Sequence, residues 1–322
     1  MNALRRGLLL AGAALAAPSF AWAQGYPTHA VRAVVPFPPG GATDIVARPI
    51  VQELSKRLGQ PFLVENVPGA SGDIGTAKVA KAAPDGYTLL VAYSSHVVNL
   101  SLFGKVPYDP VRDFAPITLA ATSPAVLSVH PAFPARTLEE LIALIKANPG
   151  KYTYASGGTG TQPHLAAEQL RLSLGLDITH VPYNGGGPAL VSMIAGHTPI
   201  GFTTLPPTVP HIKNGKLRAL AIAASKRSQS VPDVPTMAEA GYPGVEGDTW
   251  VGVFAPAGTD KQIVGLLNRE IAGILSQPAM RERLAELGYE PVGNSPDQFA
   301  GQIKTEIAKW AKVIRSAGIQ PQ

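Results

Sequence analysis

The sequence predicts an α/β fold in which mostly parallel sheets are covered by helices on both faces. Short apolar runs typical of strands alternate along the chain with helical patterns, which is the arrangement of α/β proteins. Hydrophobic residues make up 45% of the 322 residues, and 33 glycines and 31 prolines punctuate them. Charged residues make up only 15%. A disordered chain is therefore excluded, and the length allows two domains with separate cores.

The first 23 residues predict a leader. Arg5 and Arg6 precede an apolar run at 7–17, and residues 21–23 read Ala-Trp-Ala, the small-residue pattern of a cleavage site. The run is shorter than the roughly 20 residues that span a bilayer. We therefore predict a cleaved signal peptide and a periplasmic protein. The twin arginine half-matches a Tat signal, so the export route, Sec or Tat, stays open.

The charge and the residue types exclude several functions. Cleavage would delete two arginines and no acids, lowering the net charge from +5 to +3. The chain has no basic run interleaved with aromatics, so we expect no nucleic-acid partner. There are no cysteines, and the seven histidines lack metal-pair spacing, so the sequence predicts no metal and no cofactor.

The mature chain opens with a strand followed by a helix. Residues 30–37 alternate between apolar and polar, then turn apolar, which predicts a strand entering a buried sheet. The next apolar residues recur every four positions and predict a helix with one buried face: Val46, Ile50, Leu54 and Leu58. Pro49 lies inside this pattern, so we expect a kink or a helix that begins after Thr43.

The remaining elements follow from the same two periodicities. Further strands are expected at 61–66, 87–93, 125–129, 152–156, 178–181, 217–223 and 250–254. Helices are expected at 137–147, 163–174, 188–195, 261–275, 281–287 and 296–314. No strand pattern follows the last helix, so the C-terminal helices should cover an existing domain as a closing layer.

Three loops share one composition: a strand, a stretch dense in glycine and hydroxyl residues, then a helix. They lie at 36–44, 156–164 and 182–188. Glycine exposes backbone N–H groups, and the start of a helix leaves several of these unpaired at the positive end of its dipole, where anions bind. Ordinary turns and helix caps have the same composition. Together the three loops predict a crevice that holds a carboxylate at each end.

Enzyme motifs are incomplete. The stretch at 69–73 resembles a nucleophile elbow, but Asp73 stands where the pattern needs glycine. A catalytic pair of Ser156 with His164 is an open alternative. The simpler interpretation places His164 in the first turn of a helix, where it lines or supports the pocket. Asp44 is interpreted as a helix-start residue stabilised by the dipole.

Several segments, in order along the chain, carry a family resemblance. They lie at 36–44, 155–161, 164–166, 181–185, 188–189, 234–241, 254–259 and 310–312. Together they resemble the Bug (TctC-like) family, the exported solute receptors of tripartite tricarboxylate transporters. The resemblance implies a two-lobed periplasmic-binding-protein (type II) fold that closes about a hinge. It implies crossings near 121–124 and 223–226, which predicts a first lobe of 24–122 plus 226–322 and a second lobe of 123–225.

The resemblance also implies a ligand site. Family members are similar in holding a small carboxylate between backbone amides of two loops, with ordered waters. Carried over, the predicted ligand-binding residues are Phe37, Gly41, Ala42, Thr43, Asp44, Ser94, Ser95, Ser156, Gly158, Thr159, Gly160, Thr161, His164, Tyr183, Asn184 and Thr203.

One departure from the family shapes the expected ligand. Relatives often carry acids near the strand that follows Gly196, whereas residues 198–204 here contain none. Such an acid would suit an ammonium group, so its loss argues against amino acids. We expect a dicarboxylate, aliphatic or aromatic. Thr203 would then be a neutral donor, and Phe37, Tyr93 and Tyr183 would flank a ring.

The resemblance implies a partner as well. The expected function is capture of the carboxylate and its delivery to the membrane permease subunits of a tripartite tricarboxylate-type transporter. Two alternatives remain: a receptor that signals to a membrane sensor, and an exported serine hydrolase. No coiled-coil heptads are present, so we expect a monomer.

Overall fold

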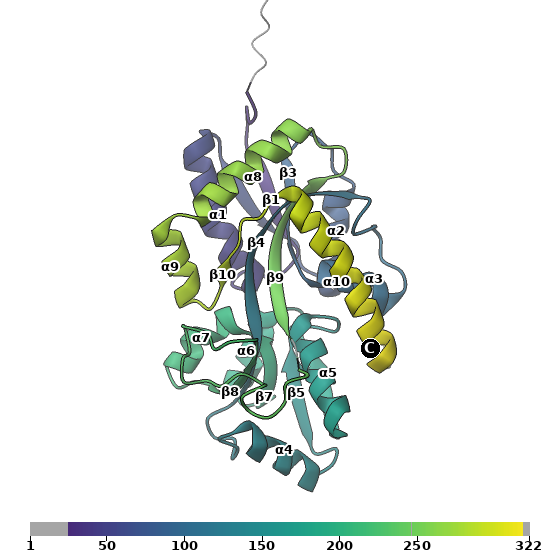
Figure 1. Ribbon diagram of the computed structural model, residues 1–322, viewed down its shortest axis with the longest axis vertical. Coiled ribbons are helices and arrows are strands. Elements are labelled where there is room, and N and C mark those ends of the chain that lie inside the picture. The colour runs from purple at the N-terminus through teal and green to yellow at the C-terminus, as the bar shows by residue number, and fades with distance from the viewer. Residues whose placement is uncertain (1–24, 246, 318–322) are drawn as a thin grey trace, which may run out of the picture.

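Two lobes are stacked along the long axis and are joined by two long strands, β4 (Phe114–Val129) and β9 (Asp248–Pro256) (Figure 1). This computed structural model describes residues 25–245 and 247–317. The predicted leader at 1–23 lies outside these residues. Within them, no helix has both the length and the apolar character needed to cross a membrane.

The other strands and the helices alternate in the predicted order, with additional helices at 73–80, 95–103 and 205–213 and a short strand at 290–291 that the sequence pattern did not indicate. The strands are β1 (Val31–Val35), β2 (Phe62–Asn66), β3 (Thr88–Tyr93), β5 (Tyr152–Ser156), β6 (Ile178–Pro182), β7 (Ile200–Thr204), β8 (Arg218–Ala223) and β10 (Glu290–Pro291). The helices are α1 (Ala42–Leu58), α2 (Asp73–Ala80), α3 (Ser95–Phe103), α4 (Leu138–Ala147), α5 (Gln162–Leu174), α6 (Gly186–Ile194), α7 (Leu205–Lys213), α8 (Lys261–Leu275), α9 (Pro278–Glu286) and α10 (Pro296–Ala317). A short 3-10 turn, Ala70–Gly72, precedes α2.

Each lobe is built on its own part of one mixed sheet. In the first lobe the strand order is β2-β1-β3-β9-β4, with β1 parallel to both of its neighbours and β9 antiparallel to both of its own. In the second lobe the order is β4-β7-β5-β6, in which β5 is parallel to β6 and β7 while β4 is antiparallel to β7 and β8. The parallel pairs therefore lie toward the outer edges and the antiparallel pairs surround β4.

The chain passes between the lobes within β4 and again before β9. Strand β4 pairs with β9 up to Pro124, and from Ala125 it pairs with β7 and β8. The return lies later than the predicted 223–226, because Met237 and Val245 pack in the core of the second lobe. The amide of Ala125 also bonds to the carbonyl of Gly247. This packing moves the proposed end of the second lobe from residue 225 to Gly247.

In each lobe helices cover both faces of its part of the sheet, in agreement with the predicted architecture. In the first lobe α1, α8 and α9 bury one face, and α2, α3 and α10 bury the other. In the second lobe α4 and α5 cover one face, and α6 and α7 cover the opposite face. Helix α1 begins at Ala42 and runs through Pro49, so the expected later start was wrong. Pro49 removes the N–H that would bond to the carbonyl of Ile45, and the burial of Val46 and Ile50 on either side of it offsets this loss.

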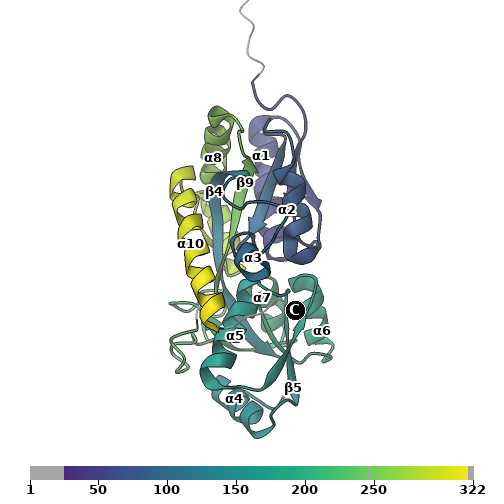
Figure 2. The ribbon, with the colours of Figure 1, turned by 90° about the vertical axis from the view of Figure 1, so that its right-hand side faces the viewer.

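The last helix closes the first lobe as expected. Phe299, Ile303, Trp310 and Ile314 are buried along one face of α10, which reaches down to α5 of the second lobe (Figure 2). Phe299 lies over Gly252 of β9. A Cβ atom at Gly252 would approach the Cζ and Cε1 atoms of Phe299 closer than 3.0 Å. Glycine at this position therefore makes room for the ring.

His96, at the start of α3, predicts a pH-dependent stability. Its imidazole is buried against Tyr108, Phe114 and Phe254, and this burial lowers the pKa of His96 to about 4. An unfolded histidine has a pKa near 6.5. Between about pH 6.5 and 4 the unfolded chain binds a proton that the folded chain does not, so stability falls as the pH falls, by up to about 1.4 kcal/mol per pH unit.

We therefore expect the melting temperature to fall between pH 7 and 4.5, and to fall less steeply in His96→Phe. Phenylalanine keeps the aromatic packing and removes the proton-binding site, while every carboxylate stays in place. Thermal melts followed by circular dichroism at half-unit pH steps measure both slopes. Identical slopes in the two proteins would contradict the assignment.

Candidate ligand-binding cleft

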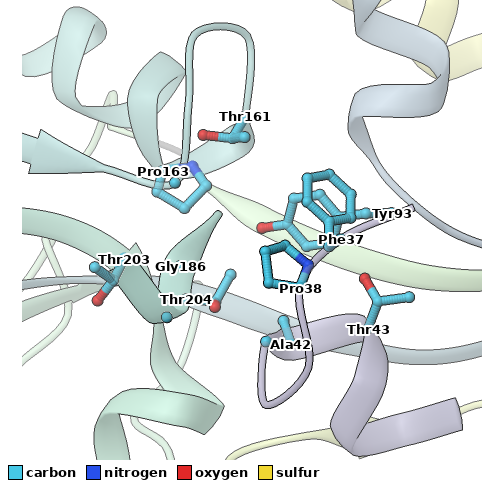
Figure 3. Close-up of a pocket in the computed structure, with 13 residues that line it drawn as sticks. Phe37, Pro38, Ala42, Thr43, Tyr93, Thr161, Pro163, Gly186, Thr203 and Thr204 are labelled. Carbon is cyan, nitrogen blue, oxygen red and sulfur yellow. The ribbon is translucent and has the colours of Figure 1, made fainter. Parts of the chain in front are cut away.

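A narrow cavity lies between the two lobes (Figure 3). Its thirteen lining residues come from both lobes: Phe37, Pro38, Gly41, Ala42, Thr43 and Tyr93 from the first, and Gly157, Thr161, Pro163, Gly186, Gly187, Thr203 and Thr204 from the second. We call it the inner cavity. Its volume is about 40 Å³, room for about three water molecules. None of these thirteen residues is charged, so an ionic ligand here must be held by dipoles.

Four helices begin at the inner cavity. Their N-cap residues are Gly41 of α1, Thr161 of α5, Gly185 of α6 and Thr204 of α7, and none of them caps its helix with a side chain. Side-chain caps are present on α4 and α8, at Thr137 and Asp260, whereas α2, α3 and α9 lack them as well, so what distinguishes the four starts is that they meet at one cavity. Unpaired N–H groups at helix starts bind anions. The four uncapped starts therefore bring unpaired N–H groups to an uncharged cavity, an arrangement that suits an anion.

The N–H donors are unevenly distributed between the lobes. The amides of Ala42, Thr43 and Asp44 at the start of α1 bond to no other described group; we call them the donor triplet. In the second lobe, prolines remove amides from the first turns: Pro163 in α5, Pro188 in α6, and Pro206 and Pro207 in α7. The first lobe thus presents three donors in a row, whereas the longest run in the second lobe is two, at Gly186 and Gly187 of α6.

The threonines of the second lobe direct their hydrogens away from the cavity. The Thr161 hydroxyl donates to the carbonyl of Gly158 at 2.7 Å. The Thr208 hydroxyl donates to the carbonyl of Thr204, so in its 2.8 Å bond with Thr203 the hydrogen comes from Thr203. In this arrangement the hydrogen of Thr203 is used by Thr208 within the second lobe, so it is not available for the donor role that the sequence suggested.

The first lobe adds one hydroxyl beside the triplet. The Tyr93 hydroxyl is buried and makes no hydrogen bond of good geometry within the described residues. Burial raises the pKa of Tyr93, and Thr249 lies close enough to offset part of this rise. In Figure 3 this hydroxyl points into the space between the lobes. The rings of Tyr93 and Phe37 meet edge to face, with centroids 5.8 Å apart. An aromatic wall and a buried hydroxyl therefore lie beside the start of α1.

A second, larger cavity adjoins the first. This outer cavity shares Phe37, Pro38 and Gly157 with the inner one and has a volume of about 430 Å³. Of the predicted site residues, Phe37, Gly41, Ala42, Thr43, Thr161 and Thr203 line the inner cavity, and Phe37, Gly158, Thr159, Tyr183 and Asn184 line the outer one. The Tyr183 hydroxyl bonds to Ser192 and Thr198, so its ring is held by the second lobe.

The other six predicted residues line neither cavity: Asp44, Ser94, Ser95, Ser156, Gly160 and His164. Asp44 holds the first loop in place. Its carboxylate accepts from the amide of Gly40, from Arg48 and from Asn66. Burial raises the pKa of Asp44, but these hydrogen bonds outweigh it and hold the pKa below its usual range. The ion pair with Arg48 also balances a negative charge beside the donor triplet.

Ser156 pairs with a histidine other than the one suggested by the sequence. Its Oγ lies 2.7 Å from Nε2 of His180 and accepts from the amide of Gly158. The neighbouring strands β5 and β6 bring Ser156 and His180 together. His164 stacks on His180, with centroids 4.2 Å apart, and its Nδ1 accepts from the amide of Gly160. Ser156 is fully buried, so this cluster shapes the glycine loop and offers no exposed nucleophile.

The loop at 69–73 was set aside as a failed enzyme motif, yet it contacts the cleft. Ala70 and Ser71 have left-handed backbone angles, φ 46° and 51°, which are strained for residues with side chains. Ser95 and Asn99 of α3 donate to the Ser71 carbonyl. The Ser71 hydroxyl donates to the carbonyl of Thr159 in the second lobe at 3.1 Å. Ser71 therefore links the lobes at the outer cavity, as no sequence pattern indicated.

Comparison with known proteins agrees with this architecture. Residues 46–319 match the model of the tripartite tricarboxylate transporter family receptor, TctC. Protein BugT of Bordetella pertussis is 43% identical over 314 residues, covering 97% of this chain and 96% of BugT.

Solved structures align over nearly the same span. A Rhodopseudomonas palustris protein with adipate has a TM-score of 0.90 at 37% identity, covering 92% of this chain and 100% of that one. MatC of the same organism, with bound malate, has a TM-score of 0.85 at 38% identity, covering 90% of this chain and 100% of MatC. The periplasmic binding protein BugD has a TM-score of 0.88 at 35% identity, covering 92% and 100%. The chain belongs to the TctC (Bug) family of tripartite tricarboxylate transporter receptors.

Proposed function

We propose that this protein is a periplasmic receptor that captures a small dicarboxylate between its two lobes. The bound ligand is delivered to the membrane subunits of a tripartite tricarboxylate-type transporter. The observation that most directly supports this proposal is that four uncapped helix starts converge on a cavity lined by uncharged residues. Helix starts from both lobes face this cavity, so a ligand with a carboxylate at each end would engage both, provided that the lobes separate enough to enlarge the space of about 40 Å³.

The energies suffice without a basic side chain. Hydrogen bonds to a charged group contribute roughly 1.5–3 kcal/mol each. Five such bonds from backbone amides contribute roughly 7.5–15 kcal/mol in all, so bonds in the upper half of this range reach the approximately 8 kcal/mol of micromolar affinity after about 4 kcal/mol of association costs. Two relatives described above were solved with adipate and with malate, which are both dicarboxylates. These ligands support a dicarboxylate for this chain too.

Isothermal titration calorimetry of the leaderless protein tests the proposal. The panel contains C4 to C6 diacids, a terephthalate-like diacid, citrate, glutamate, and a monoacid and a diamine of matched length. We expect micromolar or tighter binding of at least one diacid, a much weaker monoacid, and no diamine binding. Tight binding confined to glutamate, or no binding of any carboxylate, would contradict the proposal.

Delivery and assembly need separate measurements. Light scattering should give the mass of one chain with and without ligand. Ligand-loaded protein should be retained by membranes that contain the transporter subunits and not by membranes that lack them. Retention by a sensor kinase in place of the transporter would favour the signalling alternative.

The link between the lobes predicts a modest loss of affinity in Ser71→Ala. Removing the Ser71 hydroxyl deletes its bond to the Thr159 carbonyl, and a neutral hydrogen bond contributes about 0.5–1.5 kcal/mol. We expect a roughly two- to tenfold weaker affinity, mainly through faster dissociation. Stopped-flow experiments measure the dissociation rate and calorimetry measures the affinity, both with whichever diacid of the panel binds most tightly.

Ser173→Ala is the matched control. Its hydroxyl donates to the carbonyl of Leu170 at 3.1 Å within the second lobe, so the same kind of bond is lost without affecting the contact between lobes. Affinity should be unchanged in this variant. Equal dissociation rates in the wild type and in Ser71→Ala would show that the Ser71 bond does not stabilise the closed cleft.

A further inference from the structure

A tyrosine from the far end of the chain reaches the start of α1. The hydroxyl of Tyr289 donates to the carbonyl oxygen of Ala42 at 2.5 Å, across 247 residues of sequence. Tyr289 is 3% exposed and lies in the chain between α9 and β10. No motif pointed to it, because its partner is a backbone atom.

The carbonyl that Tyr289 contacts belongs to the same peptide group as a cavity donor. A planar peptide joins the C=O of Ala42 to the N–H of Thr43, and the two point in opposite directions. The Thr43 N–H is the middle member of the donor triplet. A hydrogen bond at the oxygen fixes the plane of this peptide and polarises its N–H, which makes the N–H a stronger donor.

The Ala42 oxygen does not need Tyr289 in order to be satisfied. As the first helical residue, Ala42 also offers this oxygen to the helix amide four residues on. The tyrosine bond is therefore an addition, and its loss leaves no orphaned buried carbonyl. A purely structural role would be met by the ring alone, which packs in the core with α1, α8 and α9.

The loop between α9 and β10, which contains Gly288 and Tyr289, also contacts the second lobe. Gly288, with φ +86°, lies so close to α7 that an added Cβ would be 2.9 Å from Cδ2 of Leu205. Leu205 is the first residue of α7 and follows Thr204, which lines the inner cavity. Next in the chain, β10 pairs with β4 at Ala121 and Thr122, near the crossing between lobes. The position of Tyr289 is thus tied to both lobes.

We propose that Tyr289 is a positioning residue for ligand binding: through the Ala42 carbonyl it orients and polarises the Thr43 N–H that receives the ligand carboxylate. The inference rests on the proposed function for the identity of the ligand. The hydrogen bond and its effect on the Thr43 amide exist without ligand.

The test compares Tyr289→Phe with Tyr26→Phe. The Tyr26 hydroxyl also donates to a backbone carbonyl, that of Gly86, at 2.7 Å and in the same lobe, but it lies away from the cleft. In Tyr289→Phe we expect roughly three- to tenfold weaker diacid binding and, without ligand, an upfield shift of the Thr43 amide proton. In Tyr26→Phe both should stay at wild-type values, even if its melting temperature falls.

Two outcomes would overturn the inference. One is wild-type diacid affinity in Tyr289→Phe; the other is an unshifted Thr43 amide proton. If Tyr289→Phe does not fold, 3-fluorotyrosine at position 289 keeps the ring and makes the hydroxyl a stronger donor. Affinity should then rise and the Thr43 proton should move downfield, and no change in either would equally overturn it. Because the amide shift is read without ligand, failure here is distinguishable from failure of the dicarboxylate proposal.

Discussion

Ala42→Pro is expected to weaken dicarboxylate binding roughly 10- to 100-fold while the protein remains folded. Proline removes the first N–H of the donor triplet and places its ring where that hydrogen pointed. A hydrogen bond to a charged group contributes about 1.5–3 kcal/mol, and each 1.4 kcal/mol is tenfold in affinity. Calorimetry with whichever diacid of the proposed panel binds most tightly measures the loss.

The helix should tolerate this change. Ala42 is the first residue of α1, a position that proline favours because its missing N–H has no intrahelical partner. Gly41 has φ −76° and ψ 172°, the extended geometry that a residue before proline adopts.

Lys261→Pro is the control for helix starts in general. Lys261 is the exposed first residue of α8, and Asp260 before it has φ −51° and ψ 132°. Folding and diacid affinity should both be retained there. Undiminished affinity in Ala42→Pro would remove the donor triplet from the proposed site.

Gly252→Ala is expected to destabilise the fold by about 2–3 kcal/mol, because overpacking a filled core typically costs about 1–3 kcal/mol. The new methyl group would overlap the Cζ and Cε1 atoms of Phe299, and it would also approach Cε2 of Phe254 at 3.1 Å. Chemical denaturation of the ligand-free protein measures the free energy of unfolding.

A double-mutant cycle with Phe299→Leu tests the cause. Leucine lacks both of the ring atoms that the methyl group would overlap, so Gly252→Ala should cost much less in that background. Gly301→Ala, on the same helix α10 and with nothing within 4 Å of its added Cβ, should be neutral or stabilising. If Gly252→Ala lowered the free energy of unfolding equally in both backgrounds, the steric explanation would be wrong.

Periodicity predicted most elements but missed the short helices α2 and α3, which have no long amphipathic pattern, and elements that contain prolines. Helix α8 and strand β5 have the predicted bounds, because each has a clear pattern between turn signals. The first half of β4 was missed: Pro116 and Pro124 argue against a central strand. The structure accommodates Pro116 at a register shift beside β9. Helix α7 was missed because Pro206 and Pro207 resemble a loop, although both occupy first-turn positions that need no N–H.

The site was predictable at the level of loops but not of contacts. The glycine-rich loops before α1, α5 and α6 do meet at one cavity, since helix starts at the carboxyl ends of strands tend to face the same crevice. The pairing of Ser156 with His180 depends on the register of two parallel strands, and linear spacing contains no information about it. The bond from Tyr289 to Ala42 is equally invisible, because any residue can supply a backbone carbonyl.

The scarcity of amides in the proline-rich first turns of the second lobe sets an order of events. In an open molecule a dianion would find its densest group of partners on α1 alone, so it should settle there before the cleft shuts. The opposite lobe, with its scattered amides, would contribute only on arrival. Release would then begin with withdrawal of α5, α6 and α7, and a transporter that pulls on these helices would free the cargo without disturbing α1.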